Sequence, residues 1–139
     1  MAAVLIGCSS DVTSPQLHAF VYSAATTACT AADGPAVVIF LAPLPVEELD
    51  PSPPYVVVFV PVGAAELTTH PWSIGSNQEA GALLQLDPST SEIAEGSMIV
   101  NSVGGDNSIN GSLDLQFPHA GRIKTEFQAK SLSSNFYCI

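Results

Sequence analysis

Few residues in this chain of 139 have side chains that could perform catalysis or bind a metal ion. The three histidines are His18, His70 and His119, and they show neither HxH nor HExxH spacing. No cysteine stands at ligand spacing, so the pattern does not predict a metal site. The sequence has no GxSxG motif, and Cys8 has no evident histidine partner. We therefore expect no catalytic residue, no enzyme activity and no cofactor.

Two groups of acidic residues invite a chemical interpretation. Glu47, Glu48 and Asp50 lie close together, but paired carboxylates hydrolyse glycosides only in a cleft that raises the pKa of one of them. The segment Asp106–Gly111, DNSING, resembles the first half of a calcium-binding loop. Phe117 stands where that loop would place its bidentate glutamate. A hairpin turn accounts for the same residues, so we predict a turn.

The irregular segment 63–77 contains the only tryptophan, Trp72. If Trp72 is exposed, it could form a stacking platform for sugar rings together with Tyr55 and Tyr22. The opposite interpretation is that Trp72 closes one end of the hydrophobic core. The first interpretation predicts a carbohydrate- or protein-binding module that uses the 63–77 loop, with Trp72 and Tyr55 as ligand contacts.

The charge distribution excludes one class of partner. The formal net charge is −10, and the only basic residues are Arg122, Lys124 and Lys130. Nucleic-acid binding needs many basic side chains to neutralise phosphates, so we expect none. Docking on an anionic lipid surface is disfavoured for the same reason. Arg122 and Lys124 are placed to pair across strands with Asp114, and any acidic partner would meet the outward face of 122–130.

The hydrophobic pattern predicts an all-β fold. Ala36–Ala42 and Tyr55–Val62 are apolar runs typical of core strands, and residues 95–130 read as a meander of three antiparallel strands. Alternation also predicts a strand over 17–22. The chain is 47% hydrophobic and 12% charged, which is not a disordered composition. We expect residues 12–139 to form one antiparallel β-sandwich or jelly-roll-like barrel of about seven to nine strands.

The beginning of the chain predicts a cellular location. Leu5-Ile6-Gly7-Cys8 resembles the lipobox of bacterial lipoproteins, and Ser9-Ser10-Asp11 resembles the polar tether that follows it. The resemblance implies cleavage before Cys8 and a diacylglycerol group on its sulfur. Residues 1–11 would then be a partial lipoprotein signal and tether, since no basic region precedes the apolar residues. Ser9 after the cysteine suits delivery to the outer membrane.

The second half of the chain adds a further resemblance to small bacterial exported lipoproteins. The matching pattern is Gly111, Phe117, Gly121, Phe127, Ala129 and Cys138. The second cysteine that usually lies near Cys138 is missing, so the resemblance implies a disulfide with Cys29. Families of this type mostly have no assigned activity. We expect a non-catalytic, monomeric β-domain of the cell envelope, at the outer membrane or in the periplasm, held by lipid on Cys8 and open to a glycan or protein partner.

Overall fold

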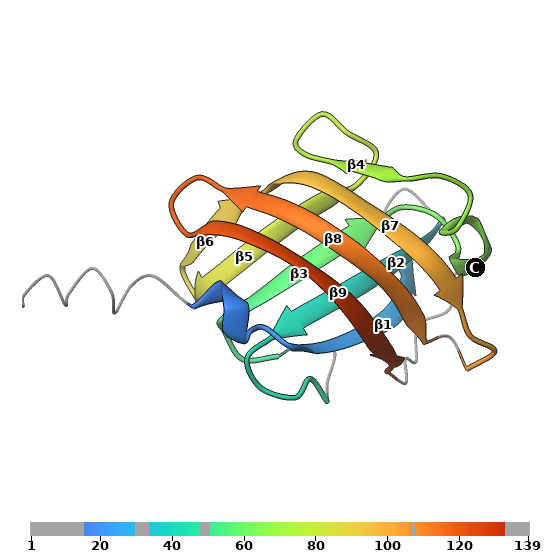
Figure 1. The fold of residues 1–139 in the computed structure, drawn as a ribbon, viewed down its shortest axis with the longest axis horizontal. Helices are drawn as coiled ribbons and strands as arrows, with labels where there is room; N and C mark the ends of the chain where they lie inside the picture. The colour runs from blue at the N-terminus through green and yellow to red at the C-terminus, as the bar shows by residue number, and fades with distance from the viewer. Residues whose placement is uncertain (1–15, 30–33, 48–50, 107, 133–139) are drawn as a thin grey trace, which may run out of the picture.

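The computed structural model describes residues 16–29, 34–47, 51–106 and 108–132, and these residues form nine strands and two short 3₁₀ turns (Figure 1). The all-β prediction of seven to nine strands is confirmed. The elements, in chain order, are η1 (Leu17–Ala19), β1 (Tyr22–Cys29), β2 (Pro35–Ala42), β3 (Tyr55–Val60), η2 (Ala64–Glu66), β4 (Trp72–Ile74), β5 (Gly81–Asp87), β6 (Thr90–Ile93), β7 (Glu95–Val103), β8 (Ile109–Phe117) and β9 (Gly121–Ser131).

The strands form one sheet in the order β4-β7-β8-β9-β1-β2-β3-β5-β6. The sheet curls into a half-barrel, in which β7, β8 and β9 cross over β5, β3 and β2 (Figure 1). Neighbouring strands of the described residues pair antiparallel, except β1 and β9, which run parallel. That parallel pair joins the two halves through Ala24 opposite Lys130 and Ala25 opposite Ser131.

One continuous stretch, residues 90–103, serves both ends of the sheet. β6 is the last strand in the sheet order and β7 the second, yet only Ala94 separates them along the chain. The Ala94 backbone N–H donates to the carbonyl oxygen of Ala82 at 3.0 Å. Near the same corner, the Gly75 N–H donates to the carbonyl oxygen of Ala80 at 3.1 Å. These bonds bring the two ends of the sheet together and close the core at that side.

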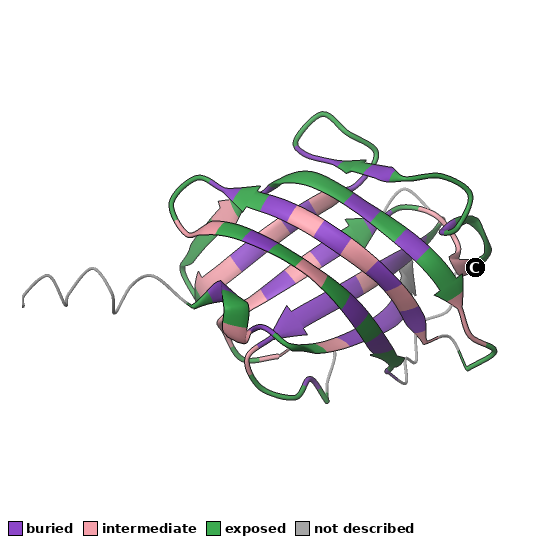
Figure 2. Cartoon of the chain, viewed as in Figure 1, coloured by how far each residue is buried: buried purple, intermediate pink, exposed green. Residues whose placement is uncertain are grey.

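The core fills the space inside the curl because apolar side chains alternate with polar ones (Figure 2). On β2, the inward side chains Val37, Ile39 and Leu41 are fully buried. The outward Phe40 of the same strand is also buried, in a second cluster that includes Leu132. The prediction that Ala36–Ala42 is covered on both faces is therefore confirmed.

The predicted meander is present as β7, β8 and β9. Its close packing depends on Gly111: a Cβ there would lie 2.3 Å from the carbonyl oxygen of Ile99 and 3.0 Å from Cζ of Phe127. The turn between β8 and β9 ends at Gly121, whose φ of +106° favours glycine. Glu92 of β6 holds this turn, since its Oε1 accepts the backbone N–H groups of His119 and Ala120 at 2.8 and 3.1 Å.

The strand predicted over residues 17–22 is wrong. Leu17–Ala19 forms a 3₁₀ turn, and β1 begins only at Tyr22. The reason is that Leu17 and Phe20 are both buried. A spacing of three places two side chains on the same side of a 3₁₀ turn, whereas a strand would point them to opposite faces.

Candidate functional site

The three cysteines are only partly covered by the structure. Cys8, the expected lipidation site, and Cys138 lie outside the described residues. Cys29 is the last residue of β1, opposite Pro35 of β2. The expected disulfide between Cys29 and Cys138 and the lipid anchor at Cys8 therefore remain predictions.

Trp72 does not offer a stacking surface. The residue is 2% exposed and belongs to the main core cluster. Its Nε1 donates a hydrogen bond to the carbonyl oxygen of Leu67 at 2.9 Å, and the His70 ring covers it with the ring centroids 4.1 Å apart. Burial counts against the expected contact between Trp72 and a ligand, and it agrees with the alternative that Trp72 closes the core.

Tyr55 lies in a different part of the molecule from Trp72. Tyr55 is half-buried, and its ring meets the edge of Phe40 with centroids 5.8 Å apart and an interplanar angle of 72°. Both rings belong to the second cluster, which does not include Trp72. The structure therefore does not bring Trp72 and Tyr55 together into one platform. Tyr22, the third aromatic residue considered, is 44% exposed and stands at the start of β1.

A concave surface lies on the outside of the meander. We call it the meander face and define it by the outward side chains of β7, β8 and β9: Ser97, Ile99, Asn101, Asn110, Ser112, Asp114, Arg122, Lys124, Glu126 and Gln128. The strand register aligns these side chains in rows, because residues that pair across an antiparallel sheet point to the same side. One row is Ser97–Asp114–Lys124 and the next is Ile99–Ser112–Glu126.

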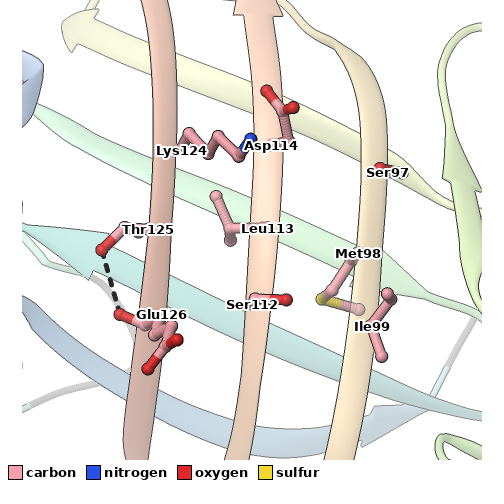
Figure 3. A pocket seen from close by; sticks show the side chains of 9 residues that line it. All are labelled: Ser97, Met98, Ile99, Ser112, Leu113, Asp114, Lys124, Thr125 and Glu126. Atoms are coloured by element: carbon pink, nitrogen blue, oxygen red, sulfur yellow. Dashed lines mark hydrogen bonds between the residues drawn. The ribbon is translucent and has the colours of Figure 1, made fainter.

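Two shallow hollows occupy this face. The first has a volume of about 620 Å³ and lies over the two rows just described (Figure 3). The second has a volume of about 740 Å³ and extends toward β1, where Tyr22 lines it with Asn101, Asn110 and Gln128. Glu126 lines both hollows. The two hollows therefore lie next to each other on the three strands, with Glu126 at the boundary that they share.

A two-point ion pair borders the first hollow. Arg122 donates from Nε to Oδ1 of Asp114 at 2.8 Å and from Nη2 to Oδ2 at 2.6 Å, which confirms the predicted cross-strand pairing for Arg122. The hydrogen bond from Arg122 lowers the pKa of Asp114, and the charge of Lys124 lowers it further. The same bond raises the pKa of Arg122. In Figure 3, the Lys124 side chain reaches toward Asp114.

Two other aspartates are held in their ionised form by turns. Asp106 Oδ1 accepts both the backbone N–H and the hydroxyl of Ser108, and these bonds lower the pKa of Asp106. Asp87 makes the same two contacts with Ser89, which lower its pKa in the same way. The carboxylate at the start of the calcium-like segment thus stabilises a hairpin turn, as the turn interpretation predicts.

Within the described part of the chain, no group of three or more His, Cys, Asp or Glu side chains is placed to hold a metal ion. No helix there has the length and apolar character that crossing a membrane requires. The chain matches no protein-family model, no curated protein and no solved structure.

Sequence reasoning directed attention to the outward face of 122–130 but missed the rest of the meander face. The signal was present in the alternating polar residues of β7 and β8, such as Ser97, Ser112 and Asn110. Alternation alone identifies a solvent-facing side, and it does not reveal that the side is hollowed or which residues meet across the strands.

Proposed function

We propose that this chain is a non-catalytic, exported domain of the cell envelope that acts by binding and is held at the membrane by lipid on Cys8. The observation that supports the non-catalytic part is the state of three aspartates, Asp87, Asp106 and Asp114. A general acid needs a raised pKa to keep its proton near neutral pH. The pKa values of Asp87, Asp106 and Asp114 are instead lowered, and each carboxylate already accepts hydrogen bonds from neighbouring side chains.

The lipid anchor is supported by the lipobox-like sequence and by charge. Acyl chains contribute about 0.8 kcal/mol of membrane affinity per buried CH₂ group. A body with a net charge of −10 gains no attraction from anionic lipid headgroups, so stable attachment would have to come from such chains. The same proposal implies that the protein is located at the outer membrane or in the periplasm.

We further propose that the domain is a monomer. Curled sheets that leave edges open risk pairing with a second chain, and short edge strands reduce that risk. The two end strands here, β4 and β6, are three and four residues long. Size-exclusion chromatography with light scattering should therefore give a mass near 14.4 kDa for the unlipidated chain. A stable dimer mass would contradict this part.

The anchor is tested by metabolic labelling in the source cell with an alkyne analogue of palmitate. We expect label on the wild-type chain and none on the Cys8→Ser variant, which should also move from the membrane to the soluble fraction. Cys29→Ser is the matched control, because it removes a thiol outside the lipobox and should keep the label. A wild-type chain without label would refute the lipid anchor.

A further inference from the structure

We propose that the chain's own segment 133–139, which lies outside the described residues, packs across the outer side of β2 and β3. This inference goes beyond the proposed function, and it can fail without affecting the lipid anchor. Three observations carry it: an apolar sheet face that is partly exposed, the position of Leu132 beside that face, and the side chains that follow Leu132 in the sequence.

The outer side of β2, β3, β5 and β6 is apolar, in contrast to the meander face. We call it the outer patch and define it by six outward side chains: Val38, Tyr55, Val57, Phe59, Leu83 and Ile93. The strand register places Val38 opposite Phe59, and Leu83 opposite both Val57 and Ile93, so these side chains point to one side.

The outer patch has the composition of a surface that another segment covers. β2 and β3 contain no charged residue, and such continuous apolar strands are typical of strands that are covered on both faces. Phe59 and Ile93 are nevertheless 40% and 56% exposed. Contiguous exposed apolar side chains mark surfaces that bind another part of a protein.

The end of β9 lies at the border of the outer patch. Leu132 belongs to the second cluster together with Phe40, and three side chains of the outer patch pack against that cluster. The Leu132 N–H donates to the carbonyl oxygen of Ala25 on β1 at 2.8 Å. Lys130 Nζ donates to Glu47 Oε1 at 2.9 Å. These bonds fix the point from which segment 133–139 continues.

The sequence of segment 133–139 suits this position. It reads SSNFYCI, so it contains Phe136, Tyr137 and Ile139 and no charged residue that packing would have to bury. Phe136 is four residues beyond Leu132, and four residues span about 13 Å. In the sheet order β3 is three positions from β9, or about 14 Å. The two aromatic rings can therefore reach β2 and the near side of β3.

Other occupants fit the outer patch less well. Segments 30–33 and 48–50 read TAAD and ELD, so each contains an acid and neither contains an aromatic residue. Residues 1–15 precede Leu17, which packs in the main core cluster and not in the second. A second copy of the chain would bring another net charge of −10, and like net charge keeps proteins apart.

The test is a comparison of ¹³C–¹H methyl spectra of the full, unlipidated chain under reducing conditions, so that the expected disulfide does not influence the result. Phe136→Leu with Tyr137→Leu keeps the segment apolar and removes both rings, whose ring currents displace the signals of neighbouring methyl groups. We expect the methyl signals of Val38 and Val57 to shift between parent and variant. Unshifted signals of both valines would overturn the proposal.

Two further readings of the same spectra separate the occupants. The methyl signals of Val21 and Ile99, which are exposed on other parts of the molecule, should not shift in the variant. Equal shifts at all four residues would show that the segment has no preferred position. In the parent, the signals of Val38 and Val57 should not change on dilution. A change on dilution would show that a second copy covers the outer patch, and it would refute the proposal.

A matched pair of variants tests whether the rings cover the outer patch. Phe136→Ser with Tyr137→Ser should weaken packing of the segment about tenfold or more, because each ring loses its burial. The fluorescence of anilinonaphthalene sulfonate, a dye that binds exposed apolar surface, should therefore rise. Ser133→Asn with Ser134→Asn alters the same segment but keeps both rings, and its dye fluorescence should equal that of the parent. An equal rise in both variants, or a rise in neither, would contradict the proposal.

Discussion

Glu92 offers the sharpest test of how the half-barrel is held together. Its side chain is 11% exposed and links β6, at one end of the sheet, to the turn between β8 and β9. One oxygen, Oε1, accepts the backbone N–H groups of His119 and Ala120, which lie 27 and 28 residues further along the chain. Glu92→Ala removes this acceptor and leaves two N–H groups without a protein partner.

The magnitude follows from the two bonds. A hydrogen bond to a charged group contributes about 1.5–3 kcal/mol to stability. Water can replace the acceptor at the exposed His119 but less well at the half-buried Ala120. We therefore expect Glu92→Ala to lower the free energy of unfolding by about 2–3 kcal/mol. In a domain of this size, the melting temperature would fall by about 6–10 °C.

Urea titration followed by circular dichroism gives the free energy of unfolding directly. Glu92→Gln keeps an amide oxygen as acceptor and should cost about 1 kcal/mol, since neutral hydrogen bonds are roughly half as strong. Glu126→Ala, at an exposed site on β9, should stay within about 0.5 kcal/mol of wild type. Amide hydrogen exchange should accelerate at Ala120 in Glu92→Ala. If Glu92→Ala were as stable as wild type, the turn would not depend on this contact.

Three further predictions concern the core, the meander face and the tryptophan. Gly111→Ala should lower the free energy of unfolding by about 2–4 kcal/mol in a urea titration, because its Cβ would overlap with the backbone of a neighbouring strand. Gly105→Ala, which has open space around it, should leave the free energy of unfolding almost unchanged. Equal effects would show that the close approach at Gly111 is not needed. Ionised Asp114 should stabilise the fold above its unfolded pKa of about 3.9, and this contribution should be lost as the pH falls through its lower folded pKa. The free energy of unfolding of Asp114→Asn should therefore fall less than that of wild type between pH 5 and pH 2.5. Identical acid sensitivity would contradict the lowered pKa. Trp72 should show blue-shifted fluorescence that resists quenching by iodide, because its ring is buried. Trp72→Phe, which loses the hydrogen bond to Leu67, should lower the free energy of unfolding by about 1–3 kcal/mol. Strong quenching would show that the ring is exposed.

The strands of the meander were predictable because each has one side in the core and one in water. In β8, Ile109, Leu113 and Leu115 point inward between polar neighbours, and that period of two is local information. The corner at Ala94 was not predictable, since a small apolar residue between two strands carries no signal for a change of partner. The pattern over 17–22 misled for a related reason: spacings of two and three both fit a short segment that contains Leu17 and Phe20.

The same limit applies to the candidate site. The cross-strand pair of Arg122 and Asp114 could be foreseen from alternation on adjacent strands. The burial of Trp72 could not, because it depends on a hydrogen bond to the Leu67 carbonyl and on packing against residues distant in sequence. A tryptophan in a polar segment has the same local pattern whether it faces solvent or core. The curl of the sheet determines whether such a tryptophan faces the core or the solvent.

The parallel pair of β1 and β9 bears on the predicted disulfide. The Leu132 N–H donates to the carbonyl oxygen of Ala25 at 2.8 Å, so β9 ends beside β1 while running in the direction of Cys29. Cys29 lies four residues beyond Ala25, about 13 Å along a strand. Cys138 lies six residues beyond Leu132, and six residues can span about 20 Å. The chain is therefore long enough for the bond.

Such a bond would close a loop of more than 100 residues, for which the chain-entropy estimate is about 4–5 kcal/mol. It would also strengthen the junction between β1 and β9, where the described residues form two paired positions. We expect peptide mapping of protein from an oxidising compartment to recover Cys29 and Cys138 in one linked fragment, and Cys29→Ser to lower the melting temperature only under non-reducing conditions. Free thiols at both positions would show that this short parallel junction holds without a covalent link.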